Sequence, residues 1–209
     1  MDKQRREARE AVKNLPFKEK IKHFWYYYKT HTICIAFAVI LIVTTTVQCM
    51  RQTKYDMNIA YYSVRHVEKP QLDALTDLLE TVAEDTNENG SVDVFISFLS
   101  GDITTELLDQ YAQMGLQKMQ VEVATDEYQS FILDRAYLDT MERLYSDVIG
   151  SVLKISDVPK IKEAIGLPDG EELYLVTTKM FDRAKDDDTK VKEHKNAVVI
   201  KEYFEGKIK

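Results

Sequence analysis

The segment from Asp85 to Asp93 (Asp-Thr-Asn-Glu-Asn-Gly-Ser-Val-Asp) is the best local motif for metal binding in this sequence. Oxygen-bearing side chains at alternate positions, followed by glycine, are typical of an EF-hand calcium loop. The twelfth position, where an EF-hand supplies a bidentate glutamate, is Ile96. We therefore favour a turn in which Asn and Gly adopt left-handed conformations and end a helix. No metal site is predicted, and calcium binding stays an open alternative.

Polar side chains also lie where three apolar, strand-like segments end. Ser63 and Arg65 follow the first segment, Ser100 and Asp102 the second, and Asp134 the third. Ligands of open α/β sheets bind beyond the carboxyl ends of the strands, where such side chains meet. The sequence therefore predicts these five residues as a binding site for a small polar ligand. Helix capping and solvated loops are the alternative reason for polar residues at these places.

Motifs that carry enzymatic chemistry are missing from the sequence. It contains no GxSxG elbow, P-loop, GxGxxG fingerprint or HExxH pair. After residue 50 the only histidines are His66 and His194, of which His194 is expected to be solvated in a Lys- and Glu-rich helix. We therefore predict no enzyme, no catalytic residue and no cofactor. A hydrolase that uses carboxylates alone stays open, because its acids need not be close in sequence.

The elements that must position these residues follow from hydrophobic periodicity. Strand-like and helix-like segments alternate four times, the pattern of βαβ units. The near-continuous apolar segment 92–99 is typical of a strand buried on both faces. Strands are predicted at 56–63, 92–99, 130–134 and 172–178, and helices from Pro70, at 104–125, 136–145, 158–165 and 186–204. Strands at 119–123 and 198–200 are the alternatives, and 150–157 is left unassigned.

The fold class predicted for residues 51–209 is therefore α/β. We expect one domain with a mainly parallel sheet of four or more strands, flanked by helices.

Charge divides the chain into three parts. Residues 1–29 contain nine Lys and Arg against four Asp and Glu, residues 30–50 contain none of these four types, and residues 51–209 carry a net charge of −12. Residues 51–209 are called the body below. Its acidic charge argues against nucleic acid as a partner, because phosphate binding needs a basic surface.

The uncharged part, 30–50, is predicted to be a transmembrane helix. Its 21 residues reach about 30 Å as a helix, the thickness of a bilayer core. The threonines at 44–46 can bond to the helix's own backbone, and the aromatic run 24–28 favours the headgroup region. The basic residues 1–29 predict a cytoplasmic N-terminus, a single-pass anchor in the plasma membrane and an extracytoplasmic body.

Three other interpretations of this segment fit the sequence less well. A cleaved signal peptide would have a shorter basic region and a better site than Thr46-Val47-Gln48. Lipidation at Cys49 would need a small residue in place of Gln48. A buried helix of a soluble domain would not follow a polybasic and aromatic stretch. Both cysteines of the chain, Cys34 and Cys49, lie in or beside this segment, so the body has no disulfide or cysteine nucleophile.

Two resemblances add to this interpretation. The segment 17–29 (Phe-Lys-Glu-Lys-Ile-Lys-His-Phe-Trp-Tyr-Tyr-Tyr-Lys) resembles the pre-membrane stretch of uncharacterised single-pass membrane proteins of Gram-positive bacteria. In the body, Met119–Met141, with Phe131-Ile132-Leu133-Asp134 between two helices, is similar to one lobe of extracellular solute-binding proteins. That resemblance implies a ligand held against an α/β lobe, although the body is short for two full lobes.

The sequence therefore predicts a membrane-anchored, extracytoplasmic module that binds a small ligand or a peptide. The alternative is a structural or interaction subunit of a cell-envelope complex, whose partner would be another envelope protein.

Overall fold

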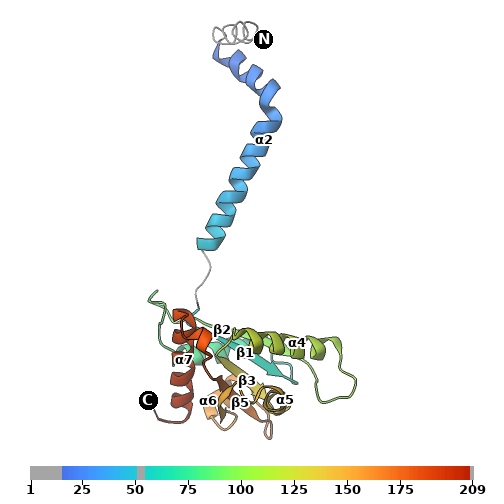
Figure 1. The fold of residues 1–209 in the computed structure, drawn as a ribbon, viewed down its shortest axis with the longest axis vertical. Coiled ribbons are helices and arrows are strands. Elements are labelled where there is room, and N and C mark those ends of the chain that lie inside the picture. The colour runs from blue at the N-terminus through green and yellow to red at the C-terminus, as the bar shows by residue number, and fades with distance from the viewer. Residues whose placement is uncertain (1–15, 51–54, 208–209) are drawn as a thin grey trace. The chain divides into compact units, whose positions relative to one another are not determined.

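A computed structural model describes residues 16–50 and 55–207 of the chain (Figure 1). The chain divides into two compact units, residues 1–53 and 54–209. Residues 1–15 of the predicted basic segment 1–29 lie outside the described residues, and so do residues 51–54, between the predicted transmembrane helix and the first strand.

The described part of the first unit, residues 16–50, forms the long helix α2 (Phe17–Met50). Within it, Tyr28–Val47 is long and apolar enough to cross a membrane, and none of that window is buried in the structure. The hydroxyls of Thr44, Thr45 and Thr46 donate to carbonyl oxygens one turn earlier, at 2.7–2.9 Å, as predicted. These bonds satisfy the hydroxyls inside the helix, so an apolar environment imposes no penalty for unpaired donors.

The second unit is an α/β domain with a five-stranded sheet, as the alternation of segments predicted. Its strands are β1 (Met57–Ser63), β2 (Val94–Ser100), β3 (Ser130–Asp134), β4 (Ile149–Lys154) and β5 (Leu173–Thr178). The strand order is β2-β1-β3-β5-β4. β1 pairs in parallel with β2 and β3, whereas β5 pairs antiparallel with both β3 and β4. The sheet is therefore mixed, with only β5 reversed.

The reversal of β5 was not predicted. The helix between β4 and β5 is α6 (Pro159–Ile165), with seven residues. After α6 the chain enters β5 beside the end of β4, where the amides of Ile155 and Ser156 donate to the carbonyl of Leu173. A strand that starts beside the end of its neighbour runs antiparallel to it.

Helices cover both faces of the sheet and bury two hydrophobic cores. The helices are α3 (Lys69–Glu80), α4 (Gln110–Thr125), α5 (Arg135–Tyr145), α6, and α7 (Asp188–Phe204), with a short 3-10 turn at Asp182–Ala184. One core joins β1 to α3, α6 and α7 through residues that include Ile59, Leu75, Ile161 and Ile200. The other joins β1 and β3 to α4 and α5 through Tyr62, Met119, Phe131 and Leu138, among others.

Helix α4 starts later than predicted, at Gln110 rather than residue 104. Asp102 accepts hydrogen bonds from the backbone and hydroxyl of Thr104, a local turn that competes with a helix. Asp109 then caps the helix by accepting from the amide of Ala112 at 2.7 Å. The alternative strands at 119–123 and 198–200 are wrong, since both segments are helical, and the unassigned segment contains β4.

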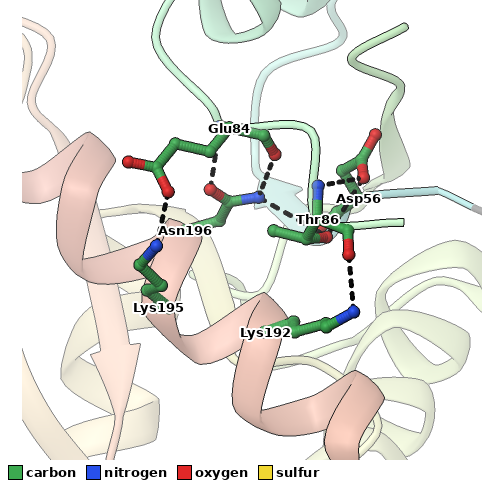
Figure 2. A network of polar contacts seen from close by, with 6 residues as sticks. All are labelled: Asp56, Glu84, Thr86, Lys192, Lys195 and Asn196. Atoms are coloured by element: carbon green, nitrogen blue, oxygen red, sulfur yellow. Dashed lines mark hydrogen bonds and ion pairs between the residues drawn. The ribbon is translucent and has the colours of Figure 1, made fainter. Parts of the chain in front are cut away.

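The start of β1 is held by a buried carboxylate. Asp56 is fully buried, and its side chain accepts from the amide of Thr86 at 2.7 Å (Figure 2) and from the amides of Asn87 and Asp93 at 2.9 Å. Burial alone would raise the pKa of Asp56, but these hydrogen bonds outweigh it, so the pKa lies below its ordinary value. The loop between α3 and β2 is therefore fastened to β1 by an ionised group.

Helix α7 is fastened to the same loop by Asn196. Its amide nitrogen donates to the carbonyl oxygens of Asp56 and Glu84, and its amide oxygen accepts from the nitrogen of Glu84 at 2.9 Å (Figure 2). Lys192 and Lys195 add bonds to the carbonyl of Thr86 and the carboxylate of Glu84. Every polar atom of the Asn196 amide is thereby used, which fixes α7 over the first core.

We predict that Asp56→Asn lowers the free energy of unfolding of the body by about 2–3 kcal/mol. The amide nitrogen of Asn cannot accept from the buried amide of Asp93, so two donors would face each other. Urea denaturation of residues 54–209, followed by far-UV circular dichroism, measures the change; both cores belong to this unit alone. The control is Asp73→Asn on the exposed face of α3, and equal midpoints for the two variants would contradict the role of Asp56.

Candidate functional site

The candidate site lies where the connections that leave β1 and β3, two neighbouring strands, turn to opposite sides. The connection from β1 runs through α3 to β2 and that from β3 runs through α5 to β4, and α3 and α5 pack in different cores. Beyond the carboxyl ends of these strands the two connections therefore separate, which is the switch point where open α/β sheets bind ligands. The five predicted site residues all lie at the carboxyl ends of the strands, around two neighbouring cavities that share Val64.

The first cavity, of about 430 Å³, contains three of the predicted residues. They are Ser63, Arg65 and Asp134, from the ends of β1 and β3. The wall is completed by Val64, Thr104, Arg135, Ala136, Gly170, Glu171 and Glu172. Two guanidinium groups and three carboxylates therefore surround one cavity.

The side chain of Asp134 is engaged in holding the cavity together. One carboxylate oxygen accepts from the amide of Val64, and the other accepts from the amide of Tyr137 at 3.0 Å, where it caps α5. Ser63 is also bonded locally, since its hydroxyl accepts from the amide of Arg65 at 3.1 Å. Both residues thus fix the backbone at the switch point.

The two arginines of the first cavity are likewise held by protein groups. Arg65 donates to the carbonyl oxygen of Ile165 at 3.1 Å, at the end of α6, and its Nε lies 3.2 Å from Glu171. Arg135 forms an ion pair with Asp139 at 2.7 Å and lies over the ring of Tyr174, 5.7 Å from its centroid. A ligand in this cavity would have to share these groups with their present partners.

The second cavity, of about 570 Å³, contains the other two predicted residues, Ser100 and Asp102. Its wall mixes apolar and acidic groups: Val64, His66, Phe98, Leu99, Gly101, Asp109 and Tyr111. The bonds from Thr104 hold the pKa of Asp102 below its usual range, so this carboxylate is ionised at neutral pH. No Lys or Arg is among the residues that line the cavity, which makes it locally acidic.

The floor of the second cavity depends on a glycine. A Cβ on Gly101 would lie 2.6 Å from the backbone of Ala112, so only glycine lets the first turn of α4 approach β2 this closely. The carbonyl of Gly101 also accepts from the hydroxyl of Tyr137 at 3.1 Å. Asp109 and Tyr111 reach the cavity through this approach, and sequence analysis missed both because it placed the start of the helix six residues too early.

The loop from Asp85 to Asp93 forms a turn in the structure. Asp85 and Asn87 accept from the amides of Gly90 and Asn89, and Glu88 and Gly90 have positive φ angles of 59° and 88°. The side chains of Asp85, Asn87 and Asn89 thus accept from amides of the loop's own backbone, and Asp93 accepts from the hydroxyl of Ser91. Within residues 16–50 and 55–207, no group of three or more His, Cys, Asp or Glu side chains is arranged to hold a metal.

Two buried carboxyl groups outside the candidate site, those of Glu122 and Glu193, were not found from the sequence. Glu122 accepts from the hydroxyl of Tyr62 at 2.6 Å, and Glu193 accepts from the side-chain amide of Asn58 at 2.5 Å. Burial raises the pKa of Glu193 to about 7 and also raises that of Glu122. Both lie in helices with charged neighbours, which gave no sign of burial. His194, expected to be solvated, is half-buried, and burial lowers its pKa.

No family model, no curated protein and no solved structure matches this chain. The resemblances to single-pass membrane proteins and to a solute-binding lobe therefore stay predictions.

We predict that Glu193 makes the body less stable as the pH rises from about 4.5 to about 7. The folded state holds a proton on Glu193 that the unfolded state releases in this range, so unfolding becomes easier as the pH increases. Glu193→Gln keeps the acceptor for Asn58 and removes the titration. At pH 8 it should raise the free energy of unfolding by up to about 3 kcal/mol, with little change at pH 4.5.

Urea denaturation at several pH values tests this effect, with Glu142→Gln on the exposed face of α5 as the matched control. A Glu193→Gln profile parallel to that of the parent chain would show that Glu193 is already ionised in the folded protein.

Proposed function

We propose that this protein is a membrane-anchored, extracytoplasmic binding module whose ligand occupies the switch point at the carboxyl ends of β1, β2 and β3. The strand order carries the proposal, because it places all five predicted residues around two cavities at one edge of the sheet. Volumes of about 430 and 570 Å³ fall in the range of small-molecule sites.

The second cavity favours a ligand with a cationic group and an apolar part. Asp102 and Asp109 supply negative charge, whereas Phe98, Leu99 and Tyr111 supply apolar surface. His66 and Ser100, whose Nδ1 and Oγ lie 3.5 Å apart, add hydrogen-bonding groups. An amine or a short basic peptide has both features, and a carboxylate or phosphate ligand would meet repulsion there.

The long apolar helix supports the anchoring part of the proposal. The side chains of Tyr28–Val47 are not buried in the structure, and such a surface is stable in a bilayer rather than in water. The basic residues of the N-terminal segment support a cytoplasmic N-terminus, which would put the body on the other side of the membrane.

A second candidate function, an interaction subunit of an envelope complex, is favoured by a different observation. Leu107, just before α4, and Tyr111 and Val121, within it, are 91%, 64% and 56% exposed. Large exposed apolar side chains of this kind are common at protein contact surfaces.

Binding is tested by the thermal unfolding midpoint of the full chain in detergent. The probes are the twenty amino acids, polyamines and short basic or acidic peptides, each supplied as a pool. We predict that a basic peptide or polyamine pool raises the midpoint by several degrees, since a ligand at a hundred times its Kd adds about 2.7 kcal/mol.

Asp102→Asn is predicted to weaken this binding about tenfold or more, because it removes charge and keeps the oxygen that accepts from Thr104. Asp73→Asn, an exposed acid on α3, is the control and should leave binding unchanged. A response to acidic pools only, or equal weakening by both variants, would overturn the assignment of the ligand class. The absence of any shift from a chain that melts cooperatively would favour the interaction subunit.

A further inference from the structure

The two edges of the sheet differ in how they are protected from pairing. β4 ends in Lys154 and has a register shift between Ile149 and Ser151, and both features discourage the addition of another strand. β2 is seven residues of Val-Phe-Ile-Ser-Phe-Leu-Ser, with no charge, no proline and no irregularity in its pairing with β1. An edge of this kind is a template for a further strand.

The outer backbone groups of β2 can be identified from its ends. The carbonyl of Asp93 and the amide of Gly101 bond toward β1, at 2.8 and 3.1 Å. By the alternation of a strand, the amide groups of Phe95, Ser97 and Leu99 also point to β1, and those of Ile96 and Phe98 point outward. Glu80 accepts from the outward amide of Val94 at 3.1 Å, so the edge offered for pairing runs from Ile96 to Ser100.

An apolar stripe of α4 runs beside this edge. Tyr111, Met114, Val121 and Thr125 share one side of the helix at spacings of three, seven and four residues, and all four are exposed. Lys118 lies in the middle of the stripe, and its ammonium bonds to Ser97 of β2 at 2.5 Å and to Glu122 at 3.3 Å. The bond to Ser97 shows that the stripe faces the β2 edge. The exposed residues between Gln110 and Thr125 are uncharged, and the charge at this face is that of the Lys118 side chain, which is 41% exposed and paired with Glu122.

We propose that the β2 edge and the α4 stripe together bind a second copy of this chain. A twofold axis beside β2 would pair the β2 strands of the two copies antiparallel. The same axis would bring the α4 stripe of one copy against the α4 stripe of the other. A peptide added to the edge would leave the stripe exposed. The net charge of −12 on residues 51–209 makes two copies repel each other over most of their surface, and this face, with no acidic residue among the exposed residues of α4, is where that repulsion is weakest.

The size of the surface suggests how strong the pairing is. The stripe is about 24 Å long and about 10 Å wide, and the edge adds five residues, so the contact is smaller than the roughly 800 Å² per partner of standard interfaces. Pairing would be weak between free molecules. Two chains anchored in one bilayer have a much higher effective concentration, so this step rests on the anchoring in the proposed function.

The test is cross-linking of the full chain in liposomes, with Cys34→Ala and Cys49→Ala in the background. Met114→Cys places one thiol in the stripe, and Glu142→Cys places one on the exposed face of α5 as a control. After treatment with a short bis-maleimide, we expect several-fold more dimer for Met114→Cys than for Glu142→Cys. Adding Val121→Lys should reduce the yield to that of the control, and adding Gln113→Lys, on another side of α4, should not.

Equal yields from Met114→Cys and Glu142→Cys at all lipid dilutions would overturn the proposal, since random encounters treat both positions alike. A high yield that Val121→Lys leaves unchanged would also overturn it. These results would leave the ligand assignment untouched, because Met114, Val121 and Gln113 do not line either cavity. A failure of membrane insertion is distinguished from a failure of pairing by liposome flotation, because a chain that is not inserted does not float with the liposomes.

Discussion

The carboxylate of Asp134 is shared between two backbone amides, and the geometry of the switch point depends on this sharing. One amide belongs to Val64, just after β1, and the other to Tyr137, in the first turn of α5. The bonds set the distance between the end of β1 and the start of α5, and Val64 in turn separates the two cavities. A single side chain thus links the strand order to the shape of the candidate site.

Much of the domain could be predicted because its signals are local. The alternation in β1, the apolar run of β2 and the leucine spacing of α3 each predicted an element, and the structure confirms that these three elements form. Their burial differs from the prediction, because β1 is buried at nearly every position, whereas β2, expected to be buried on both faces, is an edge strand in which Val94 alone is buried. The direction of β5 could not be predicted in this way, since it depends on where α6 packs and so on the end of the sheet to which it returns the chain. The burial of Glu193 was also invisible, because its partner Asn58 lies 135 positions away in the chain.

For the candidate site, the sequence indicated side chains that lie near one another, and their role in ligand binding stays a prediction. Ser63, Arg65 and Asp134 line one cavity, and Ser100 and Asp102 line the other. Each of the first three is bonded to nearby protein groups, which agrees with the alternative of capping and local loop bonds. Asp109 and Tyr111 became visible only with the close approach of Gly101 to α4. Tyr111 lines the second cavity and also begins the α4 stripe, so the two proposed surfaces meet at one side chain.

Amide hydrogen exchange of the full chain, with and without the basic peptide pool, tests the central claim that ligands bind at the switch point. The account predicts slower exchange at 64–66, 100–112 and 134–137, with little change at the amino-terminal end of β1, near Asn58 and Glu193. Protection confined to that end of β1, or to β4 and α7, would contradict the account and move the binding site to another part of the domain.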